Sequence, residues 1–145
     1  MKLINSIKEF FKNFFLLERF DFDNIVIKKD VVDDIIEFAR INHPREFIMY
    51  LEGKIRKKVL IIDGLLYQEY VSNRTSATSK VNFPIGLKIV GSVHSHPGSS
   101  AKPSKADLKS FLKNGLVHLI IKEPYFKEDI AVYLANGQAT TIKII

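Results

Sequence analysis

The stretch that most constrains this chain is GSVHSHPGSSAKPSKADLKSF, from Gly91 to Phe111. His94 and His96 stand two residues apart at the end of an expected strand, so their side chains point to the same side. An expected helix follows, and Asp107 lies in its first turn. Imidazole and carboxylate are both good zinc ligands, and a catalytic zinc ion usually has three protein ligands and one open position. The pattern therefore predicts a hydrolytic zinc site formed by these three side chains.

Composition and charge exclude several other kinds of protein. The chain has 145 residues, enough for one domain with a core of its own. It has no cysteine, which excludes disulfides, cysteine-ligated zinc and thiol nucleophiles. The net charge of +6 is spread along the chain and is a weak indication of nucleic acid, so we expect no nucleic-acid partner. No apolar run reaches the ~20 residues of a membrane span, and we expect a cytoplasmic protein.

The N-terminal residues 1–20 form the first of two expected units, and residues 21–145 form the second, a single catalytic domain. Residues 2–20 predict an amphipathic helix, because apolar residues recur at spacings of three and four. This helix would pack on the domain or on a second copy of it, as in a homodimer. The alternative is contact with a membrane surface, because aromatic residues opposite lysines are typical of interfacial helices.

The rest of the chain alternates between strand and helix patterns. Helices are expected from a cap at Asp30 to Asn42 and from Ser104 to Asn114. Strands are expected over 22–27, 46–52, 57–70 with a turn at Asp63-Gly64, 87–94, 116–121, 130–134 and 139–145. Asn136-Gly137 indicates a hairpin between the last two strands, and residues 72–82 read as a loop. This order predicts an α/β or α+β fold, with a mixed central sheet flanked by helices.

Together, the histidine pair, Pro97 and the seven-residue spacing to Ser104-x-x-Asp107 resemble the motif of the JAMM (MPN+) metalloprotease family. The resemblance covers about residues 24–135 and implies the JAMM/MPN, cytidine deaminase-like architecture. It also implies that His94, His96 and Asp107 bind Zn²⁺ and that Ser104 helps to stabilise the tetrahedral intermediate. Taken alone, Ser104 and Asp107 also match an ordinary helix capping box.

In the same family a glutamate far upstream acts as the general base. Pro44-Arg45-Glu46 followed by Leu51-x-Gly53 is similar to the family pattern P-x-E-x-x-G-x-L-x-G, with Met49 where the family often has glycine. Glu52 is a rival six residues further on, but the proline and glycine context favours Glu46. His43 and His118 have no matching partners nearby in the sequence and are interpreted as structural, and Ser95 is assigned no chemistry.

The resemblance implies a zinc isopeptidase that removes a ubiquitin-like modifier, ending in Gly-Gly, from lysine side chains. Two alternatives remain open from the sequence. One is a JAMM peptidase that trims the C-terminus of a sulfur-carrier protein. The other is a metal-free MPN scaffold that binds partners without chemistry, against which the intact set of Glu46, His94, His96, Ser104 and Asp107 argues.

Overall fold

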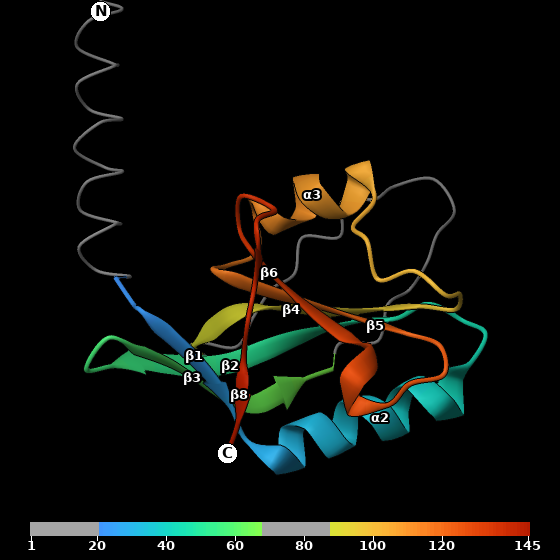
Figure 1. Ribbon diagram of the computed structural model, residues 1–145, viewed down its shortest axis with the longest axis horizontal. Helices are drawn as coiled ribbons and strands as arrows, with labels where there is room; N and C mark the ends of the chain where they lie inside the picture. The colour runs from blue at the N-terminus through green and yellow to red at the C-terminus, as the bar shows by residue number, and fades with distance from the viewer. Residues whose placement is uncertain (1–20, 68–87) are drawn as a thin grey trace, which may run out of the picture.

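The computed structural model describes residues 21–67 and 88–145, which form one mixed sheet with a helix on each face (Figure 1). The elements are β1 (Asn24–Ile27), α2 (Lys29–Asn42), β2 (Ile48–Arg56), β3 (Val59–Leu66), β4 (Ile89–His96), α3 (Lys105–Phe111), β5 (Val117–Lys122), the 3-10 helix η1 (Lys127–Asp129), β6 (Ile130–Leu134), β7 (Ala139–Thr140) and β8 (Lys143–Ile144). The predicted mixed sheet with flanking helices is confirmed. The predicted helix within residues 1–20 and the loop 72–82 lie outside the described residues. Within the described ranges, no helix is long and apolar enough to cross a bilayer.

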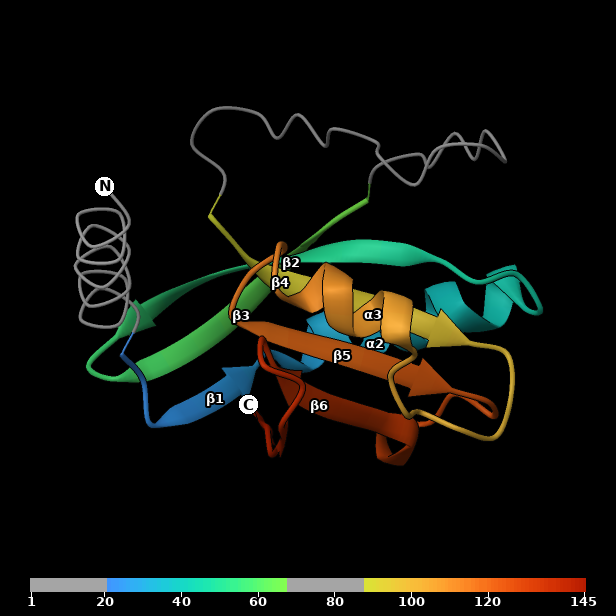
Figure 2. The same ribbon diagram turned by 90° about the horizontal axis from the view of Figure 1, so that it is seen from above.

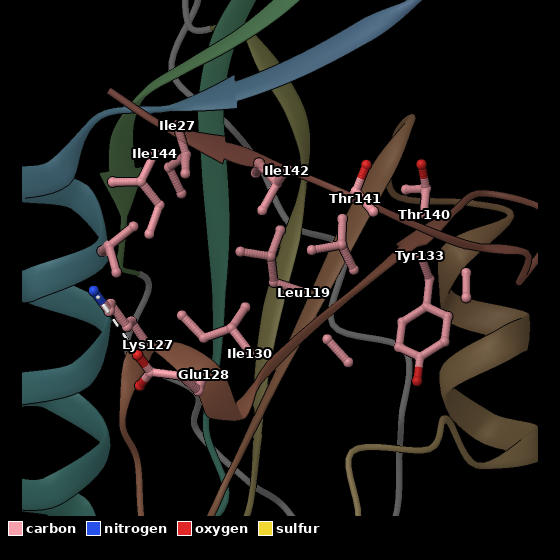
Figure 3. Close-up of a pocket in the computed structure, with 14 residues that line it drawn as sticks. Ile27, Leu119, Lys127, Glu128, Ile130, Tyr133, Thr140, Thr141, Ile142 and Ile144 are labelled. Atoms are coloured by element: carbon pink, nitrogen blue, oxygen red, sulfur yellow. Dashed lines mark ion pairs between the residues drawn. The ribbon is translucent and has the colours of Figure 1, made fainter.

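The sheet curls until its two edges lie close together. The strand order is β7-β6-β5-β4-β2-β3-β1-β8, so β7 and β8 occupy opposite edges. Thr141 and Ile142 alone separate these two strands along the chain, and three Cα steps span at most about 11 Å. Inside the curl is a cavity of about 350 Å³. Ile27 and Ile144 point into it from the β1–β8 edge of the sheet, and Leu119 points into it from the middle (Figure 3).

The core follows from which residues each element buries. Residues 117–121 of β5 are all buried, and β5 confirms the strand expected over 116–121. Helix α2 buries Val31, Val32, Ile35 and Ala39, a spacing that places them on one helical face. Figure 2 shows α3 on the near side of β4 and β5, with α2 behind the sheet. Both faces of the central strands are therefore covered, which explains why the buried residues of β5 are apolar except for His118.

The start of α2 differs from the expectation that Asp30 caps it. Lys28 occupies the cap position and Asp30 lies in the first turn, where its carboxylate accepts the amide hydrogen of Val31. The amide of Lys28 still donates to the carbonyl of Ile62 in β3. The helix therefore begins directly at the end of the strand pairing, two residues before the position that side-chain capping would select. The acidic residue still suits the positive end of the helix dipole.

The turn expected at Asp63-Gly64 is also wrong. β3 runs through both residues, and the chain reverses at Lys57 and Lys58, whose φ angles are 49° and 60°. Two consecutive positive φ angles are what a two-residue hairpin turn requires, although Asn-Gly is its usual sequence. Gly64 instead lies against the side chain of Glu52, where the register between β2 and β3 shifts.

The C-terminal run 139–145 is two short strands, not the single strand expected. β7 pairs with β6 across Gly137, whose φ is 83°, so the hairpin at Asn136-Gly137 is confirmed. The chain then leaves β6 and crosses to the opposite edge, where β8 pairs in parallel with β1. Ile145 completes this contact, because its amide donates to Ile27 and its carbonyl accepts from Lys29.

Replacing Gly91 with alanine should destabilise the fold strongly. A Cβ at Gly91 would lie 1.6 Å from the carbonyl oxygen of Val117, so β4 and β5 would have to move apart. Overpacking of this kind costs about 1–3 kcal/mol or more. Gly98 is the matched control, because a Cβ there meets nothing within 4 Å. Urea unfolding should show a large loss for Gly91→Ala and little change for Gly98→Ala; equal stability of the two variants would contradict this close approach.

Candidate active site

Strand β4 carries both histidines of the predicted site. It runs through His96, two residues beyond the expected end at His94. The strand is paired on both sides, with His94 opposite Ile48 of β2 and opposite Ile120 of β5. Pairing on two sides fixes the backbone of β4, and the two-residue period then places both imidazoles on the same face.

Asp107 of α3 lies next to both rings. Its Oδ1 is 3.5 Å from Nδ1 of His94, and its Oδ2 is 3.4 Å from Nε2 of His96. The same carboxylate accepts the amide hydrogen of Ser104 at 2.7 Å, and Ser104 Oγ accepts the amide hydrogen of Asp107 at 3.1 Å. This is a complete capping box. Capping and contact with the histidines are therefore two tasks of one side chain and do not exclude each other.

The surroundings favour the protonation states that a metal ligand needs. Burial lowers the pKa of His94, and the neighbouring His96 adds to this, against the opposing charge of Asp107. Burial also opposes ionisation of Asp107, but hydrogen bonds from Ser104 and the two nearby imidazoles outweigh it, so its pKa is lowered. A neutral imidazole and an ionised carboxylate both offer lone pairs.

These side chains fit a zinc ion by their chemistry. Two imidazoles and one carboxylate are a donor set found at catalytic zinc sites. Nε2 of His96 faces the Asp107 carboxylate, while Nδ1 of the same ring lies 3.1 Å from the carbonyl oxygen of Ser100; a histidine whose other ring nitrogen donates to a carbonyl keeps a lone pair for a metal ion. No group of described residues forms a ready-made metal cage.

Phe111 and His118 form an aromatic contact beside His94. Phe111 lies four residues after Asp107 on the same face of α3 and is fully buried. Its ring stacks on His118 with centroids 4.3 Å apart and meets His94 edge-on at 6.1 Å. His118 in turn lies 2.8 Å from Ser92 Oγ through Nδ1. The interpretation of His118 as structural agrees with this position, where it anchors the helix that carries Asp107.

The two candidate bases differ in position: Glu46 precedes β2, and Glu52 lies in the middle of that strand. Glu46 is exposed and stands two residues before the strand. Because Ile48 pairs with His94, the same register continued by two residues places Glu46 across from His96, on the face of the two histidines. Glu52 instead pairs with Ile89, five residues from His94, or roughly 17 Å along the strand. The structure therefore brings Glu46, and not Glu52, towards the histidines.

Ser104 and Ser95 take different positions around this centre. Ser104 is exposed at the start of α3, and its hydroxyl hydrogen remains available because Oγ acts as an acceptor in the cap. Ser95 is buried, and its Oγ accepts the amide hydrogen of Phe47 at 2.9 Å. Nδ1 of His96 lies 3.1 Å from the carbonyl oxygen of Ser100, which orients the second ring.

Comparison with known proteins identifies the family of this chain. Residues 28–133 match the family model described as prokaryotic homologs of the JAB domain. A protein of Haloferax volcanii named "Probable metalloprotease" is 32% identical over 127 residues, covering 82% of this chain and 78% of that protein. The chain belongs to the JAB/MPN domain family.

Two solved structures of JAB/MPN proteins are similar throughout most of the chain. A JAB1/MPN domain protein from Archaeoglobus fulgidus has a TM-score of 0.66 and 32% identity, covering 82% of this chain and 97% of that one. A structure described as a metalloprotease-like zinc site in the proteasome and signalosome has a TM-score of 0.65 and 29% identity, covering 85% and 99%. A protein from Desulfitobacterium hafniense, at 19% identity and a TM-score of 0.61, shares the fold.

Sequence reasoning missed several residues that shape this JAB/MPN site. Phe111 and Ser95 act through contacts with residues far away in the sequence, His118 and Phe47. No local pattern signals such contacts.

The protonation of His118 should make stability depend on pH. Burial lowers its pKa from 6.5 to about 4. Below pH 6.5 the unfolded chain binds a proton that the folded protein binds only near pH 4, so stability is lost as the pH falls through this window. The full effect is up to about 3 kcal/mol. Urea unfolding at a series of pH values should show a shallower decline between pH 6.5 and 4 for His118→Gln than for wild type; identical slopes would contradict this role.

Proposed function

We propose that this JAB/MPN domain protein is a zinc metalloprotease of the JAMM type that hydrolyses the bond between the C-terminal Gly-Gly tail of a ubiquitin-like modifier and a lysine side chain. One observation carries the proposal: the carboxylate of Asp107 lies within 3.5 Å of both His94 and His96. The name of the Haloferax volcanii relative supports the protease activity. The description of the similar solved structure supports zinc as the metal.

His94, His96 and Asp107 would hold the zinc ion. When bound, zinc supplies Lewis acidity and lowers the pKa of water towards ~7. The lowered pKa values of His94 and Asp107 keep both side chains in their ligand forms at neutral pH. Two pairings of β4 and the capping box of α3 hold the three side chains before any substrate arrives, which is the preorganisation that catalysis needs.

Glu46 and Ser104 carry the chemistry of the protein itself. Glu46 takes a proton from the attacking water, whose oxygen adds to the carbonyl carbon of the tail. The carbon–nitrogen bond then breaks, and Glu46 delivers the proton to the leaving amine. The hydroxyl of Ser104 donates to the developing oxyanion, a contribution of about 3 kcal/mol where such donors have been removed. No covalent intermediate is needed, which suits a chain without cysteine.

A protein substrate fits the exposed surface of the helix that carries Asp107. The face of α3 turned away from Asp107 exposes Lys105, Leu108 and Lys109, and Leu112 extends this face just after the helix ends. Neither lysine of this helix makes an ion pair with the residues the structure describes. Positive charge interleaved with apolar surface is suited to a partner that presents acidic and apolar side chains. An extended tail could add to a strand beside the site, as many peptide ligands do.

The test compares Glu46→Gln with Glu52→Gln, since both remove one carboxylate from the same segment of chain. Each variant is assayed on an isopeptide-linked modifier, on a linear Gly-Gly extension and on a short peptide. We expect Glu46→Gln to lower kcat by about 10²–10⁴-fold with zinc retained, and Glu52→Gln to stay close to wild type. Activity of Glu46→Gln equal to wild type would contradict the assigned base.

The substrate that the wild-type protein cleaves distinguishes the proposed isopeptidase from the two alternatives. Preference for the isopeptide conjugate supports the proposed reaction. Cleavage of the linear extension alone would instead indicate a peptidase that processes the C-terminus of a sulfur-carrier protein. Binding of the modifier without turnover of any substrate by the zinc-loaded wild type would indicate a partner-binding scaffold and contradict the proposal.

A further inference from the structure

The segment that carries Glu46 is fastened at both ends. Upstream, Nδ1 of His43 lies 2.9 Å from the hydroxyl oxygen of Tyr125, and the two rings meet edge-on with centroids 5.7 Å apart. Downstream, the amide of Phe47 donates to Ser95 Oγ at 2.9 Å, and the amide of Ser95 donates to the carbonyl of Phe47 at 3.1 Å. Residues 44–46 lie between these two attachments.

The hydroxyl of Ser95 accepts a hydrogen bond that a backbone carbonyl normally accepts. In an antiparallel hydrogen-bonded pair, each residue donates its amide hydrogen to the carbonyl of the other. Here Ser95 donates to the Phe47 carbonyl, but Phe47 donates to the side chain of Ser95. The regular ladder of β2 accordingly begins one residue later, at Ile48. Ser95 is 2% exposed, so water cannot easily replace this bond.

Tyr125 holds the upstream end of the Glu46 segment, at His43, and is itself fixed in the fold. It follows β5, is 4% exposed, and its amide donates to the carbonyl of Lys122 at the end of that strand. β5 is the neighbour of β4 in the sheet. Both attachments of the Glu46 segment are therefore made to the pair of strands that positions the histidines.

The carboxylate of Glu46 has no comparable support of its own. It is exposed and makes no hydrogen bond or ion pair with the described residues. Its position relative to His94 and His96 therefore depends on where the backbone of residues 43–47 is held. A shift of about 1 Å in a reacting group can cost about 10²-fold in rate.

We propose that Ser95 and Tyr125 are positioning residues, which hold the backbone on both sides of Glu46 and so place its carboxylate over the histidine pair. The inference rests on the proposed function, because it assigns Glu46 as the base. It adds a purpose for a buried serine and a buried tyrosine that themselves touch neither substrate nor metal. Ser95 points to the face opposite the two histidines and acts through Phe47 alone.

The experiment uses the full-length protein and Ser95→Ala, Tyr125→Phe and Ser95→Thr. Ser110→Ala is the matched control, because it also removes a serine hydroxyl that accepts a hydrogen bond, here from the side-chain amide of Asn114 at 2.8 Å. Amide hydrogen exchange at Phe47, zinc content, kcat and KM are measured for each variant. The exchange measurement needs neither zinc nor substrate.

We expect Ser95→Ala to speed exchange of the Phe47 amide and to lower kcat about 10-fold or more, with KM and zinc content unchanged. Tyr125→Phe should lower kcat in the same way, Ser95→Thr should restore both readouts, and Ser110→Ala should match wild type in both. The two single losses should fall short of the loss in Glu46→Gln, since each acts through that residue.

Three outcomes would overturn the inference. Unchanged exchange at Phe47 in Ser95→Ala would show that the hydroxyl does not hold this amide. Faster exchange with wild-type kcat would show that the attachment is structural and does not position the base. A loss of zinc that accounts for the loss of kcat would place Ser95 in support of the histidines instead. If Ser95→Ala is fully active while Glu46→Gln is inactive, this inference fails and the proposed function stands; if Glu46→Gln is fully active, the assigned base fails.

Discussion

The hydrogen-bonded pairing of β4 on both sides is the constraint on which the site depends. β2 pairs with it antiparallel and β5 in parallel, over the residues that include His94. The approach of β5 is so close that Gly91 leaves no space for a side chain. A strand held in this way cannot slip by one residue, and a slip would turn both histidines to the other face of the sheet. The direction of the two imidazoles is therefore a property of the whole sheet.

The second half of the site depends on the anchoring of one short helix. α3 has seven residues, too few to be stable through its own hydrogen bonds. It is fixed at its start by the capping box of Ser104 and Asp107 and near its end by Phe111, stacked on His118. The carboxylate that caps the helix is also the one that faces the histidines. Formation of the capped helix therefore also brings the carboxylate of Asp107 to the histidines.

Local patterns predicted the parts of the structure that local interactions determine. The two-residue period placed His94 and His96 on one face, and the cap placed Asp107 in the first turn of α3. The reversal at Lys57-Lys58 was missed because these residues lack the usual signal for positive φ angles. The crossing from β7 to β8 was missed because β8 pairs with β1, a strand far away in the sequence. Local patterns do not show which distant strand has an edge free for pairing. Ser95 was missed for the same reason, since its partner, Phe47, lies 48 residues away.

The most direct test of the central claim is the zinc content of purified wild type beside Asp107→Asn, with Asp33→Asn as control. Asparagine can still accept the amide hydrogen bond that caps α3, so this change removes the charged ligand while keeping the cap. Asp33 lies on α2 in an exposed ion pair with Lys29, away from the histidines. The account predicts about one zinc ion per chain in wild type and in Asp33→Asn, and its loss in Asp107→Asn. No zinc in wild type after incubation with the metal, or equal zinc in all three proteins, would contradict it.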